Sequence, residues 1–130
     1  MTQTAVEIVH VYYDALEHGD MTTLLAIASE QILVEGATSL PYAGKCQGRI
    51  AWVQFAEKFQ QVWDNPVFAI ENIHETGDCV VGLARLKATS KKTKKMIDMP
   101  MAEFFWIEDG KISRLLPFYW DTAAVIQAIN

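Results

Sequence analysis

Cysteine is scarce in this sequence, and its scarcity excludes two kinds of protein. The chain has two cysteines, Cys46 and Cys79, together with three scattered histidines. Two thiols are too few for a disulfide framework, and these residues do not show the spacing of a metal site. We therefore expect reduced thiols in a cytoplasmic protein that has no metal centre.

Long apolar runs are missing as well. No stretch approaches the roughly 20 residues that a helix needs to cross a bilayer. The first residues lack the basic start of a signal peptide and carry Glu7, His10 and Asp14 among their apolar side chains. With 51% apolar and 21% charged residues, the composition predicts one folded domain over residues 1–130 with no membrane partner.

Positive charge is in deficit, since the formal net charge is −5. This balance argues against a nucleic-acid partner. Five of the eleven cations form one cluster without aromatic neighbours, at Lys87, Lys91, Lys92, Lys94 and Lys95. Such a run is typical of a solvated turn between strands, and a patch for an anionic partner is the alternative.

The first half of the sequence contains three helical patterns. Residues 4–18 repeat apolar side chains at i, i+3 and i+4, and Gly19 and Asp20 are suited to end this helix and begin a second over 21–28. A third helix is expected over 48–63. Its apolar stripe consists of Trp52, Phe55, Ala56, Phe59 and Trp63. All three helices are expected to cover one side of a sheet.

The remaining segments predict five strands and a closing helix. The strands are expected over 31–35, 67–75, 79–89, 96–107 and 112–120, and the helix over 123–129. A loop is expected over 37–48, where glycine and proline interrupt the pattern. The order ααβαββββ plus a short C-terminal helix predicts an α+β fold, with three N-terminal helices packed on a curved, mostly antiparallel sheet.

The hairpin at residues 103–121, EFFWIEDGKISRLLPFYWD, is the stretch that the other elements are expected to cover. Alternation sorts its side chains onto two faces of the sheet. The face expected to meet the helices carries Ala102, Phe104, Trp106, Leu115, Pro117, Tyr119 and Asp121. Glu103 falls on the outer face, where we expect it to pair with Arg85 or Arg114 in a dimer interface.

The hollow between the helices and this face predicts an apolar, aromatic pocket for a small molecule. The helices are expected to line it with Tyr12, Trp52, Phe55, Phe59 and Trp63. Glu35 is a further candidate for ligand binding. Alternation points it away from the pocket if Val34 points inward, and a bulge in the strand would reverse this.

Three stretches resemble the SnoaL-like branch of the nuclear transport factor 2-like superfamily, which also contains ketosteroid isomerase. They are YYDALEHGDMTTLLAIASEQILVEG, LPYAGKCQG and MAEFFWIEDGKISRLLPFYWDTAAV. The resemblance implies a cystatin-like cone, a homodimer through the outer face of the sheet, and a pocket for a small apolar or aromatic molecule. It also implies cofactor-independent isomerase, cyclase or dehydratase chemistry.

The resemblance carries over to catalytic residues only in part. Ketosteroid isomerase uses an aspartate base, a tyrosine donor and a protonated aspartate. Tyr12 matches the tyrosine, but Gly36 stands in place of the base and Ala102 in place of the protonated aspartate, which argues against steroid isomerisation. The SnoaL group uses an aspartate as acid and base, and Asp121 matches it. The resemblance thus makes Asp121 and Tyr12 the expected catalytic residues.

Other interpretations stay open for these residues and for the whole protein. A carboxylate at Asp121 would also cap the final helix, which is worth about 1 kcal/mol. Tyr12 is equally suited to be a core tyrosine with a satisfied hydroxyl. A non-catalytic ligand-binding module and a dimeric protein-interaction module remain alternatives to an enzyme.

Overall fold

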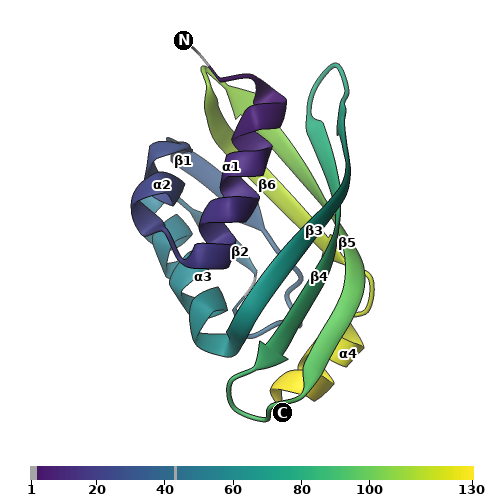
Figure 1. Cartoon of the computed structure of the whole chain (residues 1–130). Helices are drawn as coiled ribbons and strands as arrows, with labels where there is room; N and C mark the ends of the chain where they lie inside the picture. The colour runs from purple at the N-terminus through teal and green to yellow at the C-terminus, as the bar shows by residue number, and fades with distance from the viewer. Residues whose placement is uncertain (1–2, 43) are drawn as a thin grey trace.

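The computed structural model describes residues 3–42 and 44–130, and Figure 1 shows their arrangement. The elements are α1 (Ala5–His18), α2 (Met21–Ala26), β1 (Ala28–Glu35), β2 (Lys45–Gln47), α3 (Arg49–Val62), β3 (Trp63–Glu75), β4 (Val80–Ser90), β5 (Met96–Glu108), β6 (Lys111–Tyr119) and α4 (Thr122–Ile129). This order confirms the predicted α+β class. The structure adds one short strand, β2, inside the segment predicted as a loop.

The strands form a single sheet in the order β2-β1-β6-β5-β4-β3. Strands β1 and β6 run parallel, and the other neighbours are antiparallel, as expected for a mostly antiparallel sheet. β2 pairs with β1 at the edge, where Cys46 lies opposite Val34. A three-residue strand in a segment rich in glycine is too short to show alternation, so the sequence did not reveal it.

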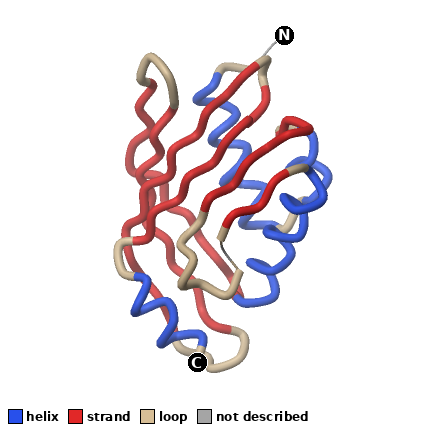
Figure 2. The backbone as a smooth tube through the Cα atoms, turned by 180° about the vertical axis from the view of Figure 1, so that it is seen from behind, coloured by secondary structure: helices blue, strands red, loops and turns tan. Residues whose placement is uncertain are grey.

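Three helices gather on one side of the molecule, and α4 lies apart from them beside the far ends of β4 and β5 (Figures 1 and 2). α1 packs against β3, while α3 packs against β1. The turn between β4 and β5 holds α4 through two bonds. The Thr93 hydroxyl donates to the Ala128 carbonyl, and the Lys95 ammonium donates to the Gln127 carbonyl at 3.3 Å. The predicted covering of the sheet by three N-terminal helices is confirmed.

The helix ends follow the capping residues in the sequence. Thr4 and Glu7 form a capping box at the start of α1. Gly19 ends α1 with a φ of 65°, a left-handed conformation that glycine adopts at little cost. Asp20 then accepts a hydrogen bond from the Thr23 N–H at 3.1 Å and so begins α2. None of the helices in the described part of the chain is long and apolar enough to cross a membrane.

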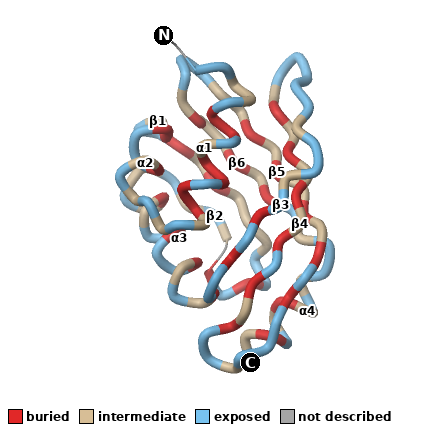
Figure 3. The backbone as a smooth tube through the Cα atoms, in the orientation of Figure 1, coloured by how far each residue is buried: buried red, intermediate tan, exposed pale blue. Residues whose placement is uncertain are grey.

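The core lies between the helices and the face of the sheet that they cover (Figure 3). Its largest fully buried side chains include Trp52, Trp63, Tyr12, Tyr13, Phe59 and Phe105. The Trp52 indole donates to the Leu24 carbonyl at 2.9 Å, so the polar atom of this large ring is satisfied inside the core. The aromatic stripe of α3 therefore fixes this helix against α2 and the sheet.

Strand β5 turns the opposite set of side chains toward the helices from the set that the sequence predicted. Glu103 and its alternate neighbours Met101 and Phe105 are buried, while Phe104 and Trp106 are half-buried on the outer face. The prediction was wrong because apolar residues occupy both alternate sets of this strand. Alternation alone could not distinguish its two faces.

Candidate functional site

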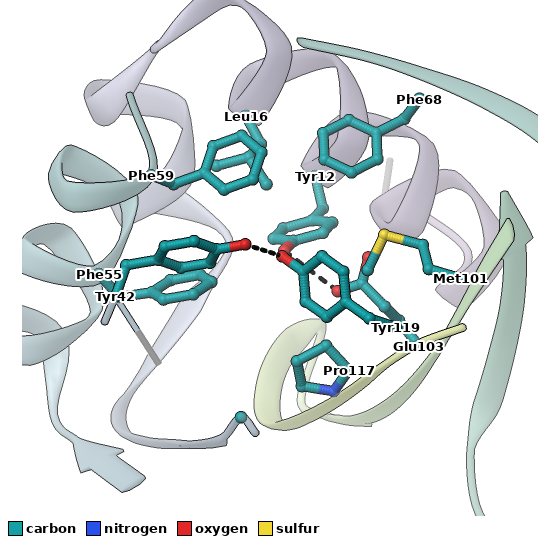
Figure 4. Close-up of a pocket in the computed structure, with 11 residues that line it drawn as sticks. Tyr12, Leu16, Tyr42, Phe55, Phe59, Phe68, Met101, Glu103, Pro117 and Tyr119 are labelled. Atoms are coloured by element: carbon teal, nitrogen blue, oxygen red, sulfur yellow. Dashed lines mark hydrogen bonds between the residues drawn. The ribbon is translucent and has the colours of Figure 1, made fainter. Parts of the chain in front are cut away.

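A pocket lies beneath the helices, between α1, α3 and strands β5 and β6 (Figure 4). Six aromatic rings line it: Tyr12, Tyr42, Phe55, Phe59, Phe68 and Tyr119. Glu103 is the acid in this lining, and Met101 and Pro117 stand beside it. We call this cavity the tyrosine pocket. It has the composition of a small-molecule site, with apolar walls and a few convergent polar groups.

Glu103 is held at the base of the tyrosine pocket and is only 1% exposed. The Tyr12 hydroxyl donates to its Oε2 atom at 3.2 Å (Figure 4). Its Oε1 atom has no hydrogen-bond partner within the described part of the chain. One oxygen of the carboxyl group is therefore held by Tyr12, and the other is buried without a hydrogen-bond partner among the described residues.

Burial changes the proton affinity of this carboxyl group. Loss of hydration raises the pKa of Glu103 to about 7, because a charged carboxylate is costly in an apolar site. The Tyr12 hydrogen bond opposes this rise. The Tyr13 hydroxyl also opposes it by lying close to the carboxyl group, although the two do not reach hydrogen-bond geometry. Glu103 is consequently present both as acid and as carboxylate near neutral pH.

The neighbouring strands leave space around Glu103. Gly82 of β4 and Pro117 of β6 lie directly opposite it on either side. A Cβ atom at Gly82 would stand 2.8 Å from the Tyr13 hydroxyl oxygen, which is closer than such contacts occur. Gly82 is thus required for Tyr13 to approach the acid. Tyr12 and Tyr13 are consecutive on α1 and diverge around the helix, so one ring enters the pocket and the other packs behind it on Phe105.

A second pair of tyrosines lies across the pocket from α1. The Tyr42 hydroxyl donates to the Tyr119 hydroxyl at 2.8 Å (Figure 4). Burial raises the pKa of Tyr42 to about 12 and raises the pKa of Tyr119 well above its usual value. Both hydroxyls therefore stay protonated at physiological pH. They are neutral hydrogen-bond donors inside an apolar cavity.

The tyrosine pocket is nearly filled by its own side chains, because its free volume is about 10 Å³. This is room for about one water molecule. A second, more open cavity of about 120 Å³ adjoins it and shares Tyr42 and Phe55 as a wall. The lining of this second cavity, which we call the vestibule, also includes Gly44, Lys45, Cys46, Gln54 and Lys58. A ligand of one ring would enter the tyrosine pocket from the vestibule if Tyr42 or Phe55 moved aside.

The structure brings part of the predicted lining together. Tyr12, Phe55, Phe59 and Tyr119 line the tyrosine pocket as expected. Trp52, Trp63 and Leu115 are fully buried in the core, outside the pocket lining. Ala102, Phe104 and Trp106 were expected in the pocket but lie on the outer face of β5. Their assignment is wrong because the alternation of that strand is ambiguous.

Asp121 does not reach the tyrosine pocket. Its side chain is exposed and accepts a hydrogen bond from the Ala124 N–H at 3.0 Å, which caps α4. The expectation of a pocket acid is wrong here because β6 ends at Tyr119, so strand alternation no longer sets the direction of Asp121. The capping interpretation of this residue is confirmed.

Glu35 also lies outside the tyrosine pocket. It forms an ion pair with Arg114 at 2.9 Å, while the preceding Val34 is buried. The Arg114 guanidinium in turn lies 4.4 Å from the centre of the Trp106 ring. Alternation at this end of β1 therefore points Glu35 away from the tyrosine pocket, and its predicted place in the pocket lining is wrong.

The expected partners of Glu103 on the outer face bind other acids. Arg85 pairs with Asp98 at 2.6 Å, and Arg114 pairs with Glu35. The expected outer-face position of Glu103 is wrong, because this side chain points inward to Tyr12. A signal for it was present in the sequence: Glu103 is the one acid in the alternate set Met99, Met101 and Phe105, which is otherwise apolar.

Side chains able to surround a metal ion are found elsewhere. Asp14, Glu17 and His18 bring possible ligand atoms within 4.8 Å of one another near the end of α1. The Asp14 and His18 side chains are exposed, and Glu17 already accepts a hydrogen bond from the Phe68 N–H. None of these three residues lines the tyrosine pocket, and among the described residues their side chains are hydrogen-bonded to its lining only at the backbone of Phe68.

Helices laid over one side of a curved, mostly antiparallel sheet are the arrangement of the cystatin-like α+β folds. The chain belongs to the SnoaL-like domain family, because the model of that family matches residues 9–115. No curated protein matches the sequence.

Solved structures share the fold. An NTF2-like protein from Burkholderia thailandensis E264 is 26% identical, covers 98% of this chain and 98% of its own, and superposes with a TM-score of 0.86. A candidate SnoaL-like polyketide cyclase from Jannaschia sp. CCS1 is 21% identical over 96% of this chain and 90% of its own, with a TM-score of 0.84. A Xanthomonas campestris protein of cystatin-like fold is 19% identical over 98% and 97%, with a TM-score of 0.83.

Proposed function

We propose that this protein binds a small apolar or aromatic carbonyl compound in the tyrosine pocket and moves a proton on it without a cofactor. The observation that carries the proposal is the buried carboxyl group of Glu103, whose pKa is raised to about 7. A general acid or base works best when its pKa lies near the working pH. Membership of the SnoaL-like family and a neighbour described as a candidate polyketide cyclase support chemistry of the isomerase, cyclase or dehydratase type.

The proton moves between a carbon atom of the ligand and Glu103. As a carboxylate, Glu103 takes a proton from the carbon next to the ligand carbonyl, so that the C–H bond breaks and an enolate forms. The Tyr119 hydroxyl accepts from Tyr42 and keeps its own proton, so it is suited to donate a hydrogen bond to the enolate oxygen. Glu103 then returns the proton to the same carbon or to another one, and the second outcome is an isomerisation.

Tyr12 acts on the ligand through Glu103 in this scheme. Its hydrogen bond to Oε2 holds the carboxyl group and leaves Oε1 without a partner in the part of the chain that the structure describes. A different role is favoured by ketosteroid isomerase, in which a tyrosine and a protonated acid together donate to the substrate oxygen. The pH profile separates the two. Turnover that rises with pH through about 7 supports Glu103 as the base, and turnover that falls supports it as the donor.

Hydrogen–deuterium exchange on simple ketones tests the proposal. Indanone and tetralone carry exchangeable hydrogens next to an aryl or cyclic carbonyl, and NMR in deuterium oxide follows their loss. We expect the protein to accelerate this exchange and Glu103→Gln to slow it by about 100-fold or more. Glu35→Gln, which removes an acid from the outer face, is the matched control and leaves the rate unchanged.

Two outcomes would overturn the catalytic role. If the ketones bind but exchange at the uncatalysed rate, the protein is a binding module. If Glu103→Gln and Glu35→Gln exchange at the same rate as the wild type, another group moves the proton. A binding constant for each ketone, measured by calorimetry, separates loss of binding from loss of chemistry.

We further propose that two copies of the chain associate through the outer face of the sheet, in the cytoplasm. Phe104, Trp106 and Phe118 pack together there, and Phe118 is 52% exposed. An exposed aromatic cluster of this kind is typical of a protein interface. Light scattering coupled to size-exclusion chromatography should give the mass of a dimer, and Phe118→Glu should give a monomer. A wild-type monomer at micromolar concentration would contradict the association.

A further inference from the structure

We propose that the vestibule binds the anionic group of the ligand, so that the molecule entering the tyrosine pocket is an aromatic or apolar compound carrying a carboxylate. The inference rests on the proposed function, because it assigns the other end of the same ligand. It names a substrate class: aryl or cyclic keto acids, with the ring and carbonyl in the tyrosine pocket and the carboxylate in the vestibule.

The charges of the vestibule support an anion. Lys45 of β2 and Lys58 of α3 line it from two different elements. Neither lysine has a salt-bridge partner among residues 3–42 and 44–130, and no acid within those residues lines the cavity. Both cations are therefore available in a chain whose formal net charge is −5. The Lys58 charge reaches the cavity wall, since it opposes the rise in the pKa of Cys46 that burial causes.

The shape of the two cavities supports a ligand with two unlike ends. The vestibule has about 120 Å³ of free volume, whereas the tyrosine pocket has about 10 Å³. Tyr42 and Phe55 belong to both linings, so displacement of either side chain would join the two spaces. A carboxylate with one or two methylene groups fits the vestibule as it stands. The ring enters the tyrosine pocket by displacing the Tyr42 or Phe55 side chain.

The tyrosine pocket itself is unsuited to the anionic end. Its walls are apolar, and burying a second carboxylate beside Glu103 would add repulsion to the cost of lost hydration. The carboxylate of a keto acid is therefore excluded from the pocket and attracted to the lysines. Both effects orient the ligand in one direction, with its carbonyl toward Glu103. The vestibule thus determines which end of the substrate enters.

Benzoylpropionate and its primary amide test this inference, since they differ in charge and scarcely in size. Binding of each is measured by calorimetry to the wild type and to Lys45→Gln/Lys58→Gln. We expect the wild type to prefer the acid by about 5-fold to 10-fold, because partly exposed ion pairs contribute modestly. The double variant should lose this preference and bind the amide as the wild type does. Lys91→Gln/Lys92→Gln changes the net charge equally at the remote β4–β5 turn and should keep the preference.

The outcomes separate this inference from the proposed function. Equal binding of acid and amide by the wild type would overturn it, and so would an equal loss of preference in both double variants. Exchange on neutral indanone tests Glu103 alone and involves no anion. If that exchange fails while the lysine-dependent preference persists, the vestibule is an anion subsite in a protein without the proposed chemistry.

Discussion

The two faces of β5 carry similar residues and have different chemistry. The outer face has Phe104 and Trp106, and the inner face has Phe105 between the pocket and the core. The acids differ in their partners. On the outer face of the sheet, Asp98 of β5 and Glu35 of β1 meet arginines at the surface, whereas Glu103 meets the Tyr12 hydroxyl in the interior. One step along the strand separates an ordinary surface from a candidate active site.

This difference indicates that environment, rather than residue type, sets the proton affinity of an acid. A carboxyl group paired with an arginine in water stays ionised, and its ion pair is worth at most about 1 kcal/mol. A carboxyl group held by a tyrosine in an apolar pocket can gain and lose a proton near pH 7. Four variants test the contrast, in decreasing order of expected effect.

Glu103→Gln should alter the pH dependence of stability most strongly. The pKa of Glu103 rises from the ordinary value of 4.5, expected in the unfolded chain, to about 7 in the folded protein. The folded state therefore holds this proton more tightly than the unfolded state. This proton binding contributes about 3 kcal/mol to the free energy of unfolding. The contribution is fully present below pH 4.5 and is lost as pH rises through 7.

Urea denaturation from pH 4.5 to pH 8 measures this effect. Glutamine resembles the protonated acid and cannot ionise, so the variant should gain stability relative to the wild type as pH rises. On the outer face, Glu35→Gln should change stability by less than about 1 kcal/mol throughout. A stability difference between wild type and Glu103→Gln that stays constant with pH would contradict the raised pKa.

Gly82→Ala should be the next most damaging change, costing about 1–3 kcal/mol. Its Cβ atom would lie 2.8 Å from the Tyr13 hydroxyl oxygen, which forces a shift beside Glu103. Gly77→Ala adds the same methyl group in a turn where nothing lies within 4 Å, and it should cost little. Thermal or urea unfolding of both variants checks the difference. Equal effects would show that Tyr13 does not need this glycine.

Tyr12→Phe should cost about 1–2 kcal/mol, because it removes the hydrogen bond to Glu103 Oε2 and leaves that oxygen unpaired. It should also raise the pKa of Glu103 further, since the lost bond favours the carboxylate. Tyr119→Phe removes the bond from Tyr42 instead and is the control for loss of a buried hydroxyl. If the pKa of Glu103 were the same in Tyr12→Phe as in the wild type, the hydrogen bond between Tyr12 and Glu103 would be contradicted.

Asp121→Ala should have the smallest effect, about 1 kcal/mol from the lost cap of α4. Binding and exchange of indanone should be unchanged, since this side chain lies outside the tyrosine pocket. Asp121→Asn keeps an oxygen that can cap the helix and should recover most of the stability. A loss of exchange with Asp121→Asn would restore this acid as a catalytic candidate.

Local signals in the sequence predicted most of the fold. The junction of α1 and α2 was correct because Gly19 and Asp20 determine it through their own backbone and side chain. Strand β6 was also oriented correctly, with Pro117 and Tyr119 lining the pocket. These features depend on neighbouring residues in the chain.

The candidate site was harder to predict because its interactions join distant parts of the chain. Tyr12 and Glu103 are 91 residues apart, and Tyr42 and Tyr119 are 77 apart. Glu103 was assigned to the outer face by the alternation of its strand, and its burial runs against the usual position of glutamate. The tertiary contact with Tyr12, absent from any local pattern, makes its burial tolerable. The predicted position of Asp121 was wrong for a related reason, because the alternating pattern does not show that β6 ends at Tyr119.

Titration of the Glu103 carboxyl carbon by NMR tests the central claim most directly. The protein is labelled with carbon-13 in glutamate, and the signal that disappears in Glu103→Gln is followed between pH 3 and pH 9. Burial of the carboxyl group beside Tyr12 predicts a midpoint of about 7 for this signal. A midpoint near 4.5, the ordinary value for glutamate, would mean that Glu103 is hydrated and ionised at neutral pH, and the proposed proton transfer would be contradicted.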